Sequence, residues 1–89
     1  MSTSKKTIVD VRTRGEFIGG HVEGSINIPL NQIQMNLEEL KKLPQPIILC
    51  CASGARSGQA TSFLRSLGIQ CENGGSWLNV NYTYQSAKW

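Results

Sequence analysis

The 89-residue sequence has no long apolar run and no cluster of basic residues. No stretch approaches the roughly 18 apolar residues that a membrane span needs, and the N-terminal segment lacks the apolar core of a signal peptide. The nine Lys and Arg residues are scattered, without the interleaved aromatics of a nucleic-acid surface. We therefore expect a cytoplasmic protein with neither a membrane nor a nucleic acid as partner, although a removed export signal would leave the same sequence.

Metal ligands are also scarce. The chain has one His and three Cys, with no CxxC pair and no zinc-type His spacing, so the sequence predicts no metal site and no disulfide framework. The short length and the absence of repeats predict a single domain over residues 1–89, with a short N-terminal tail at 1–6 and an unassigned C-terminal tail at 78–89. We expect a monomer that needs no cofactor.

Short β-branched and apolar runs alternate with helical patterns along the chain. Strands are predicted at 7–11, 25–28, 47–50 and 69–72, helices at 32–43 and 55–67, and one helical turn at 13–18. Gly74 and Gly75 predict a turn, followed by a short helix and by packed aromatics such as Trp77. Alternating strands and helices predict an α/β fold with a parallel β-sheet flanked by helices on both faces. The most continuous apolar run, 47–50, is the expected central strand.

The segment "PIILCCASGARSGQA", at 46–60, joins that strand to the second long helix. Ligands of open α/β sheets bind beyond the carboxyl ends of the strands, which makes this loop a candidate site. Its small residues let backbone amides converge on an anion or a thiolate, and helix N-termini with cationic neighbours lower a cysteine pKa to roughly 3.5–7.5. The residues expected to bind substrate are Ala52, Ser53, Gly54, Ala55, Arg56 and Ser57.

Two adjacent cysteines precede this loop, and they give different spacings to Arg56. Counting from Cys50 gives the C-x5-R spacing of cysteine-dependent phosphatases and arsenate reductases, whereas counting from Cys51 gives C-x4-R. Side chains alternate along a strand, so Cys50 should continue the apolar run into the core. Cys51 is expected to be the first residue released from the strand, at the floor of the loop. Cys51 is therefore the predicted nucleophile. The phosphatase reaction also needs an acid for the leaving oxygen, and no acidic residue lies in or just after this loop.

Several other polar residues lie near this predicted site. Arg56 could bind the anionic part of a substrate or pair with a carboxylate. Asp10 and Arg12, at the carboxyl end of the first strand, are expected to support the site by bracing the backbone. His21, in a glycine-rich turn, is expected to bond the backbone rather than act as a base, and Cys71 is expected to be inert core.

Five segments together resemble the single-domain rhodaneses, a sulfurtransferase family: "IVDVRTRGEF", "GGHVEGSINIP", "PIILCCASGARS", "LRSLGI" and "NGGSW". The resemblance covers about residues 7–77 and implies a three-layer rhodanese-like fold with Cys51 as the catalytic residue at the start of the loop that ends at Arg56. The usual strand and helix ahead of the "DVR" segment are absent, so this is a minimal version whose sheet edge lacks protection.

The resemblance implies that Cys51 takes sulfane sulfur from a small anionic donor such as thiosulfate and holds it as a persulfide. The sulfur then passes to an acceptor such as cyanide, a small thiol or a thioredoxin-like protein, without metal or cofactor. Two alternatives stay open at this point. One is a phosphatase or arsenate reductase that uses Cys50, and the other is a catalytically silent rhodanese-like module used for binding or regulation.

Overall fold

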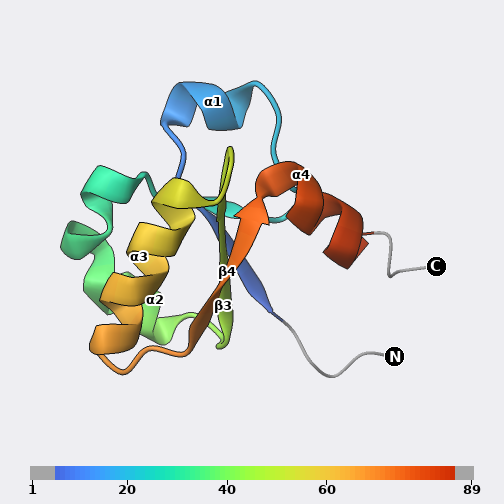
Figure 1. Cartoon of the computed structure of the whole chain (residues 1–89). Coiled ribbons are helices and arrows are strands. Elements are labelled where there is room, and N and C mark those ends of the chain that lie inside the picture. The colour runs from blue at the N-terminus through green and yellow to red at the C-terminus, as the bar shows by residue number, and fades with distance from the viewer. Residues whose placement is uncertain (1–5, 86–89) are drawn as a thin grey trace.

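A computed structural model describes residues 6–85, so most of the predicted tail at 1–6 and the last part of the tail at 78–89 lie outside the described residues. Four parallel strands form one sheet in the order β2-β1-β3-β4 (Figure 1). The strands are β1 (Thr7–Asp10), β2 (Ile26–Asn27), β3 (Ile47–Cys51) and β4 (Cys71–Ser76). The α-helices are α1 (Arg14–Ile18), α2 (Leu37–Lys42), α3 (Ala55–Ser66) and α4 (Trp77–Val80). The predicted parallel α/β architecture is confirmed.

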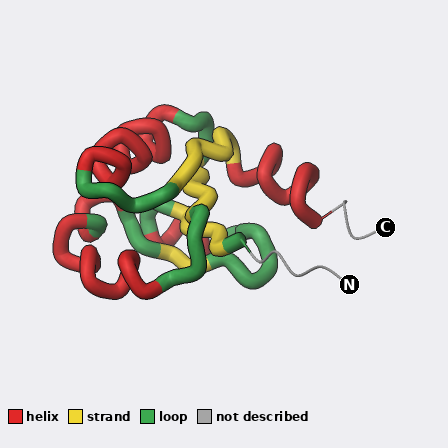
Figure 2. The backbone as a smooth tube through the Cα atoms, turned by 90° about the horizontal axis from the view of Figure 1, so that it is seen from below, coloured by secondary structure: helices red, strands yellow, loops and turns green. Residues whose placement is uncertain are grey.

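Strand β3 lies inside the sheet, and its side chains divide between two cores. Ile47, Leu49 and Cys51 belong to the larger core, which α2 and α3 cover. Ile48 and Cys50 belong to the smaller core on the other face, beneath α4. Figures 1 and 2 show α2 and α3 on one side of the sheet and α4 on the other. All five β3 residues are buried, which agrees with the predicted central strand and separates the two adjacent cysteines by a sheet.

The predicted continuous helix at 32–43 is wrong. The segment instead forms two 3-10 turns, η1 (Leu30–Gln32) and η2 (Gln34–Asn36), followed by α2. Asn36 leaves helical geometry at φ −110° and ψ 23°, and its side-chain amide donates to the Gln32 carbonyl at 2.8 Å. A short polar side chain that bonds nearby backbone in this way competes with a regular helix. The apolar spacing was nevertheless meaningful, because Ile33 and Leu40 are both buried in the larger core.

Strand β4 also differs from the prediction, since it begins at Cys71 and runs through the glycines that were expected to form a turn. Leu49 pairs with Asn73 and Cys50 pairs with Gly75, so Gly74 is an extra residue in a β-bulge. A Cβ on Gly74 would lie 2.5 Å from a Val80 methyl group. The bulge therefore needs a residue without a side chain. Beyond it, β4 continues to Ser76, opposite the last residue of β3.

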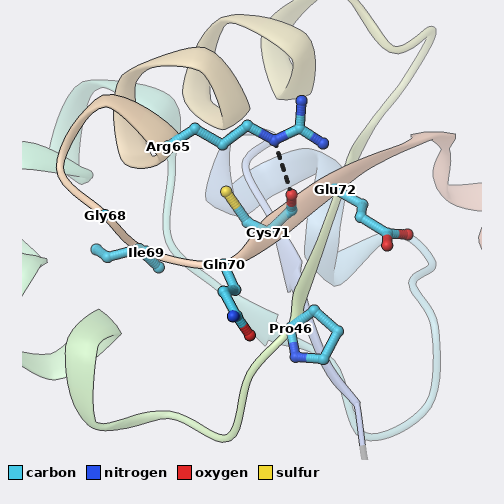
Figure 3. A pocket seen from close by; sticks show the side chains of 7 residues that line it. All are labelled: Pro46, Arg65, Gly68, Ile69, Gln70, Cys71 and Glu72. Carbon is cyan, nitrogen blue, oxygen red and sulfur yellow. Dashed lines mark hydrogen bonds between the residues drawn. The ribbon is translucent and has the colours of Figure 1, made fainter.

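The outer edge of β4 faces away from β3 and is partly capped by a side chain. Arg65 of α3 donates from Nε to the outward carbonyl of Cys71 at 3.0 Å (Figure 3). This contact lies beside an open hollow of about 520 Å³ near the start of β4, lined by Pro46, Arg65, Gly68, Ile69, Gln70, Cys71 and Glu72. One carbonyl at this edge of the sheet is thus satisfied within the chain. None of the helices within residues 6–85 has the length and apolarity to cross a membrane.

Candidate active site

The sharp connection between β3 and α3 forms the candidate site. Cys51 is the last residue of β3 and pairs with Ser76, and α3 begins at Ala55. Gly54 precedes the helix in the left-handed region at φ +104°, which glycine adopts without steric cost. The expectation that Cys51 is already released from the strand is wrong, because β4 continues to Ser76, which pairs with Cys51. Its side chain points to the α3 face and is only 1% exposed.

Hydrogen-bond donors from the loop and from the first turn of α3 surround the Cys51 sulfur. The Gly54 amide donates to Sγ at 3.0 Å, and the Ser57 amide and hydroxyl each lie 3.4 Å from it. Burial by itself would raise the pKa of this thiol. Hydrogen bonds from the Ser57 hydroxyl and from the amides of Ser57, Gly54 and Ser53 outweigh burial and lower the pKa of Cys51 to about 7. A large fraction of Cys51 is therefore thiolate at neutral pH, which is the nucleophilic form.

The remaining loop residues predicted to bind substrate lie at the exposed rim. Ala52, Ser53 and Ala55 are exposed, whereas Ser57 is buried on the first turn of α3. The Ala55 amide bonds the Ser53 hydroxyl at 3.5 Å, so this side chain braces the loop itself. The structure thus brings Gly54 and Ser57 against the sulfur and leaves a rim of small side chains open to a ligand.

The other two cysteines lie in different surroundings. Cys50 is fully buried in the smaller core on the opposite face of the sheet. Burial, followed by the charge of Asp10, raises the pKa of Cys50 to about 12. Cys71 lies in the larger core, where its thiol donates to the Thr61 carbonyl at 3.6 Å and burial raises its pKa. Only Cys51 combines a lowered pKa with hydrogen-bond donors aimed at the sulfur.

Arg56 pairs with a carboxylate, one of the two roles expected for it. Its guanidinium donates to both oxygens of Glu16 on α1, at 2.8 and 3.1 Å. Glu16 also completes a capping box with Thr13 at the start of α1. The Arg56 hydrogen bond, followed by that from the Thr13 amide, lowers the pKa of Glu16 to about 2. Sequence reasoning did not assign Glu16 to Arg56, because the two residues are 40 positions apart.

Arg56 also borders a hollow of about 350 Å³. The other residues that line this hollow are Val11, Thr13, Pro29, Leu30 and Asn31. It lies against the segment that follows β1, beyond the carboxyl end of that strand, which is where ligands of parallel α/β sheets bind.

Asp10 and Arg12 form a buried pair that braces the turn into α1. Arg12 donates to both Asp10 oxygens at 2.8 to 3.0 Å and to the Gly20 carbonyl at 2.7 Å. Its guanidinium lies 4.8 Å from the Trp77 ring centre, a cation–π contact. The hydrogen bond to Asp10 raises the pKa of Arg12. These contacts match the bracing role expected of the pair, and within residues 6–85 no hydrogen bond links either side chain to the Cys51 sulfur.

His21 bonds the backbone, as its position in the turn suggested. Its Nδ1 lies 2.6 Å from the Phe17 carbonyl, and its ring stacks on the Phe17 ring at 3.7 Å. Among the described residues, no three His, Cys, Asp or Glu side chains form a group that could hold a metal ion.

Asn73 is the site residue that sequence reasoning missed. Its Oδ1 accepts from the Ser57 hydroxyl at 2.6 Å and from the Gly75 amide at 3.0 Å, while its Nδ2 donates to the Gly54 carbonyl at 3.0 Å. A Cβ on Gly58 would lie 3.1 Å from this Nδ2. A glycine inside a helix costs about 1 kcal/mol relative to alanine, so Gly58 is explained by the room that it leaves for Asn73.

The sequence is similar to those of known proteins. Residues 1–80 match the family described as Rhodanese-like domain. The uncharacterized protein YqhL of Bacillus subtilis is 41% identical over 64 residues, which cover 72% of this chain and 50% of YqhL. The thiosulfate sulfurtransferase PspE of Escherichia coli is 32% identical over 74 residues, covering 81% of this chain and 71% of PspE.

A solved structure is similar over most of the chain. The crystal structure of a rhodanese-like domain protein from Staphylococcus aureus superposes with a TM-score of 0.75 at 32% identity, covering 82% of this chain and 71% of that one. Among the curated relatives, the chain spans about half the length of YqhL.

Proposed function

Since this chain belongs to the rhodanese-like domain family, we propose that it is a sulfurtransferase in which the Cys51 thiolate carries the transferred sulfur. The observation that carries the proposal is the set of donors around Cys51 Sγ, from Gly54 and Ser57, together with a pKa of about 7. An activated thiolate beside an anion-binding loop at a helix N-terminus is suited to covalent catalysis on an anionic substrate. The relatives that carry sulfurtransferase names support the same reaction class.

In the first half-reaction, a lone pair of the Cys51 thiolate attacks the outer sulfur of thiosulfate. The S–S bond of thiosulfate breaks, its electron pair leaves with sulfite, and Cys51 becomes a persulfide that bears the negative charge on its outer sulfur. Charge is conserved, and no oxidant or reductant is needed. Backbone amides of the small-residue loop are the groups available to stabilise that charge beyond the Cys51 sulfur.

In the second half-reaction, an acceptor nucleophile attacks the outer sulfur and leaves Cys51 as a thiolate. Cyanide would become thiocyanate, and a thiolate would become a persulfide. We propose a small thiol or a thioredoxin-like protein as the acceptor, because the loop around the sulfur presents only the small exposed side chains of Ala52, Ser53 and Ala55, which would not block an approaching thiol. The donor proposed here is a small anion such as thiosulfate.

The phosphatase alternative is much less compatible with the geometry. It needs Cys50 as the nucleophile, yet this side chain is fully buried in the core on the other face of the sheet, and its pKa is raised to about 12. A thiol with that pKa is almost wholly protonated at neutral pH. The hydrogen bonds to the Cys51 sulfur also favour an active enzyme over a silent module, because they stabilise the nucleophilic thiolate.

Intact-protein mass spectrometry after exposure to thiosulfate tests the proposal. We expect a gain of one sulfur atom, which cyanide removes with formation of thiocyanate. Cys51→Ser should abolish this gain, because a serine hydroxyl cannot hold a transferable sulfur. Cys50→Ser is the matched control and should keep it. Absence of an adduct on the wild-type protein with thiosulfate and other sulfane donors would favour a silent module. Hydrolysis of a phosphate ester that only Cys50→Ser abolishes would favour the phosphatase.

A further inference from the structure

The Ser57 hydroxyl has one proton and two acceptors within reach. Its Oγ lies 2.6 Å from Asn73 Oδ1 and 3.4 Å from Cys51 Sγ. A hydroxyl can donate to only one of them at a time. The distance to Asn73 is short even for an O–H···O hydrogen bond. Asn73 therefore competes with the Cys51 sulfur for the hydrogen bond from the Ser57 hydroxyl. Of the hydrogen bonds to this sulfur, that one lowers the pKa of Cys51 the most.

The orientation of the Asn73 amide is fixed by its other partners. Nδ2 donates to the Gly54 carbonyl, and the Gly75 amide donates to Oδ1, so an oxygen rather than an NH₂ group faces Ser57. The β-bulge in β4 provides this arrangement, since it places Asn73 opposite Leu49 and the Gly75 amide within 3.0 Å of its oxygen. The acceptor is thus held in place from a strand that is not part of the Cys51 loop.

We propose that Asn73 is a positioning residue for the Ser57 hydroxyl. While the Cys51 sulfur is uncharged, Asn73 accepts the hydrogen bond from this hydroxyl, and when the thiolate forms, the sulfur accepts that hydrogen bond instead. In the thiol, the hydroxyl donates to Asn73 Oδ1. In the thiolate, the hydroxyl rotates and donates to Sγ, and Oδ1 keeps the Gly75 amide. No bond other than hydrogen bonds changes in this exchange.

The same rotation accompanies sulfur transfer, a part of the inference that rests on the proposed function. In the persulfide, the negative charge lies on the outer sulfur, so the Cys51 sulfur is uncharged and the hydroxyl returns to Asn73. Asn73 thus favours the loaded state over the free thiolate. It does so without touching the substrate.

Other charged groups near Cys51 would be unchanged by a substitution of Asn73. Arg56 interacts electrostatically with Cys51 from α3 and is itself paired with Glu16 of α1. Cys50 precedes Cys51 on β3, and Asp10 and Arg12 pair with each other at the end of β1. A change in Cys51 titration on substitution of Asn73 therefore reports on the Ser57 hydroxyl.

The test is the pH dependence of iodoacetamide alkylation at Cys51, which does not require sulfurtransferase activity. The measured quantity is the midpoint, the pH at which the Cys51 alkylation rate reaches half of its maximum. In Asn73→Ala the Ser57 hydroxyl has no competing acceptor, so the midpoint should fall by about one pH unit, which corresponds to the free energy of one hydrogen bond to a charged group. Gly54 should stay in place, because its carbonyl also accepts from the Gly58 amide at 2.9 Å. If Asn73 merely supported the loop, its loss would loosen the donors and raise the midpoint instead.

The same substitution in a Ser57→Ala variant tests whether Asn73 acts on Cys51 through the Ser57 hydroxyl. Combined with Ser57→Ala, the Asn73→Ala substitution should no longer move the midpoint. Asn79→Ala is the matched control, because the Asn79 side-chain amide donates to the Gly74 carbonyl of the same bulge at 3.2 Å, and within residues 6–85 it has no hydrogen bond to the Cys51 loop. This control should leave the midpoint unchanged. A rise in Asn73→Ala, no change in it, or a fall that persists with Ser57→Ala would overturn the proposal.

Protection of the buried Cys50 and Cys71 from alkylation reports folding of each variant. If Asn73→Ala does not fold, Asn73→Asp keeps the acceptor oxygen in a stronger form and should raise the midpoint. A rise of equal size with and without Ser57→Ala would overturn the proposal. As a separate readout, Asn73→Ala should lower the persulfide fraction at a fixed ratio of thiosulfate to sulfite. Absence of any persulfide on the wild-type protein would instead count against the proposed function, and the alkylation test would still stand.

Discussion

Selective alkylation of Cys51 over Cys50 tests how a single β-strand gives two adjacent thiols opposite properties. The pKa is about 7 for Cys51 and about 12 for Cys50. At pH 7, roughly half of Cys51 but only about 10⁻⁵ of Cys50 is therefore thiolate. The thiolate with the higher pKa is intrinsically more nucleophilic by about two to two and a half orders of magnitude. Combining the two effects, Cys51 should be alkylated faster than Cys50 by a factor on the order of 10² or more.

Accessibility also separates the two thiols. Cys50 is fully buried between the sheet and α4, so a reagent can reach it only through opening of the smaller core. Cys51 is also covered, at 1% exposure, but by a short loop at the surface of the domain. We therefore expect the alkylation rates of the folded protein to differ by more than the hundredfold that thiolate chemistry alone gives.

The assay is a time course of iodoacetamide labelling at pH 7, with fragment-ion mass spectrometry of the peptide that contains both residues. The Cys51 rate should rise with pH and level off above about 7, because its pKa is lowered. Unfolding in urea is the internal control and should make the two rates similar. A Cys50 rate within tenfold of the Cys51 rate in the folded protein would refute the reasoning.

Three further predictions concern stability, each measured by urea denaturation. Gly74→Ala places a methyl group 2.5 Å from a valine methyl and should cost roughly 1–3 kcal/mol, so an unchanged midpoint would contradict the bulge geometry. Arg12→Leu leaves Asp10 buried without its cation and should cost about 3–5 kcal/mol, whereas a loss below 1 kcal/mol would show that the pair contributes little. The pKa of Glu16 is lowered to about 2, so its contribution is complete above its usual pKa and is lost as the pH falls toward 2. Glu16→Gln should flatten that acid dependence, and an unaltered profile would argue against the contact with Arg56.

The sequence by itself determined the order of strands and helices, because apolar runs and helical spacing are local properties of the chain. It indicated β3 as the inner strand through its unbroken apolar run, and α3 through its spacing and its terminal glycine. Strand alternation was also enough to place Cys50 and Cys51 on opposite sides. The identity of the reactive cysteine stays a prediction until the alkylation and sulfur-transfer experiments are done.

Tertiary structure decided the features that depend on pairing between distant segments. Pairing between β3 and β4 replaced an expected turn at Gly74 and Gly75 with a bulge, and the continuation of β4 to Ser76 kept Cys51 within the sheet. The same bulge brought Asn73 to Ser57, 16 residues away, while α1 brought Glu16 to Arg56, 40 residues away. No local pattern encodes such contacts, because each depends on how two elements lie against each other once the core has packed.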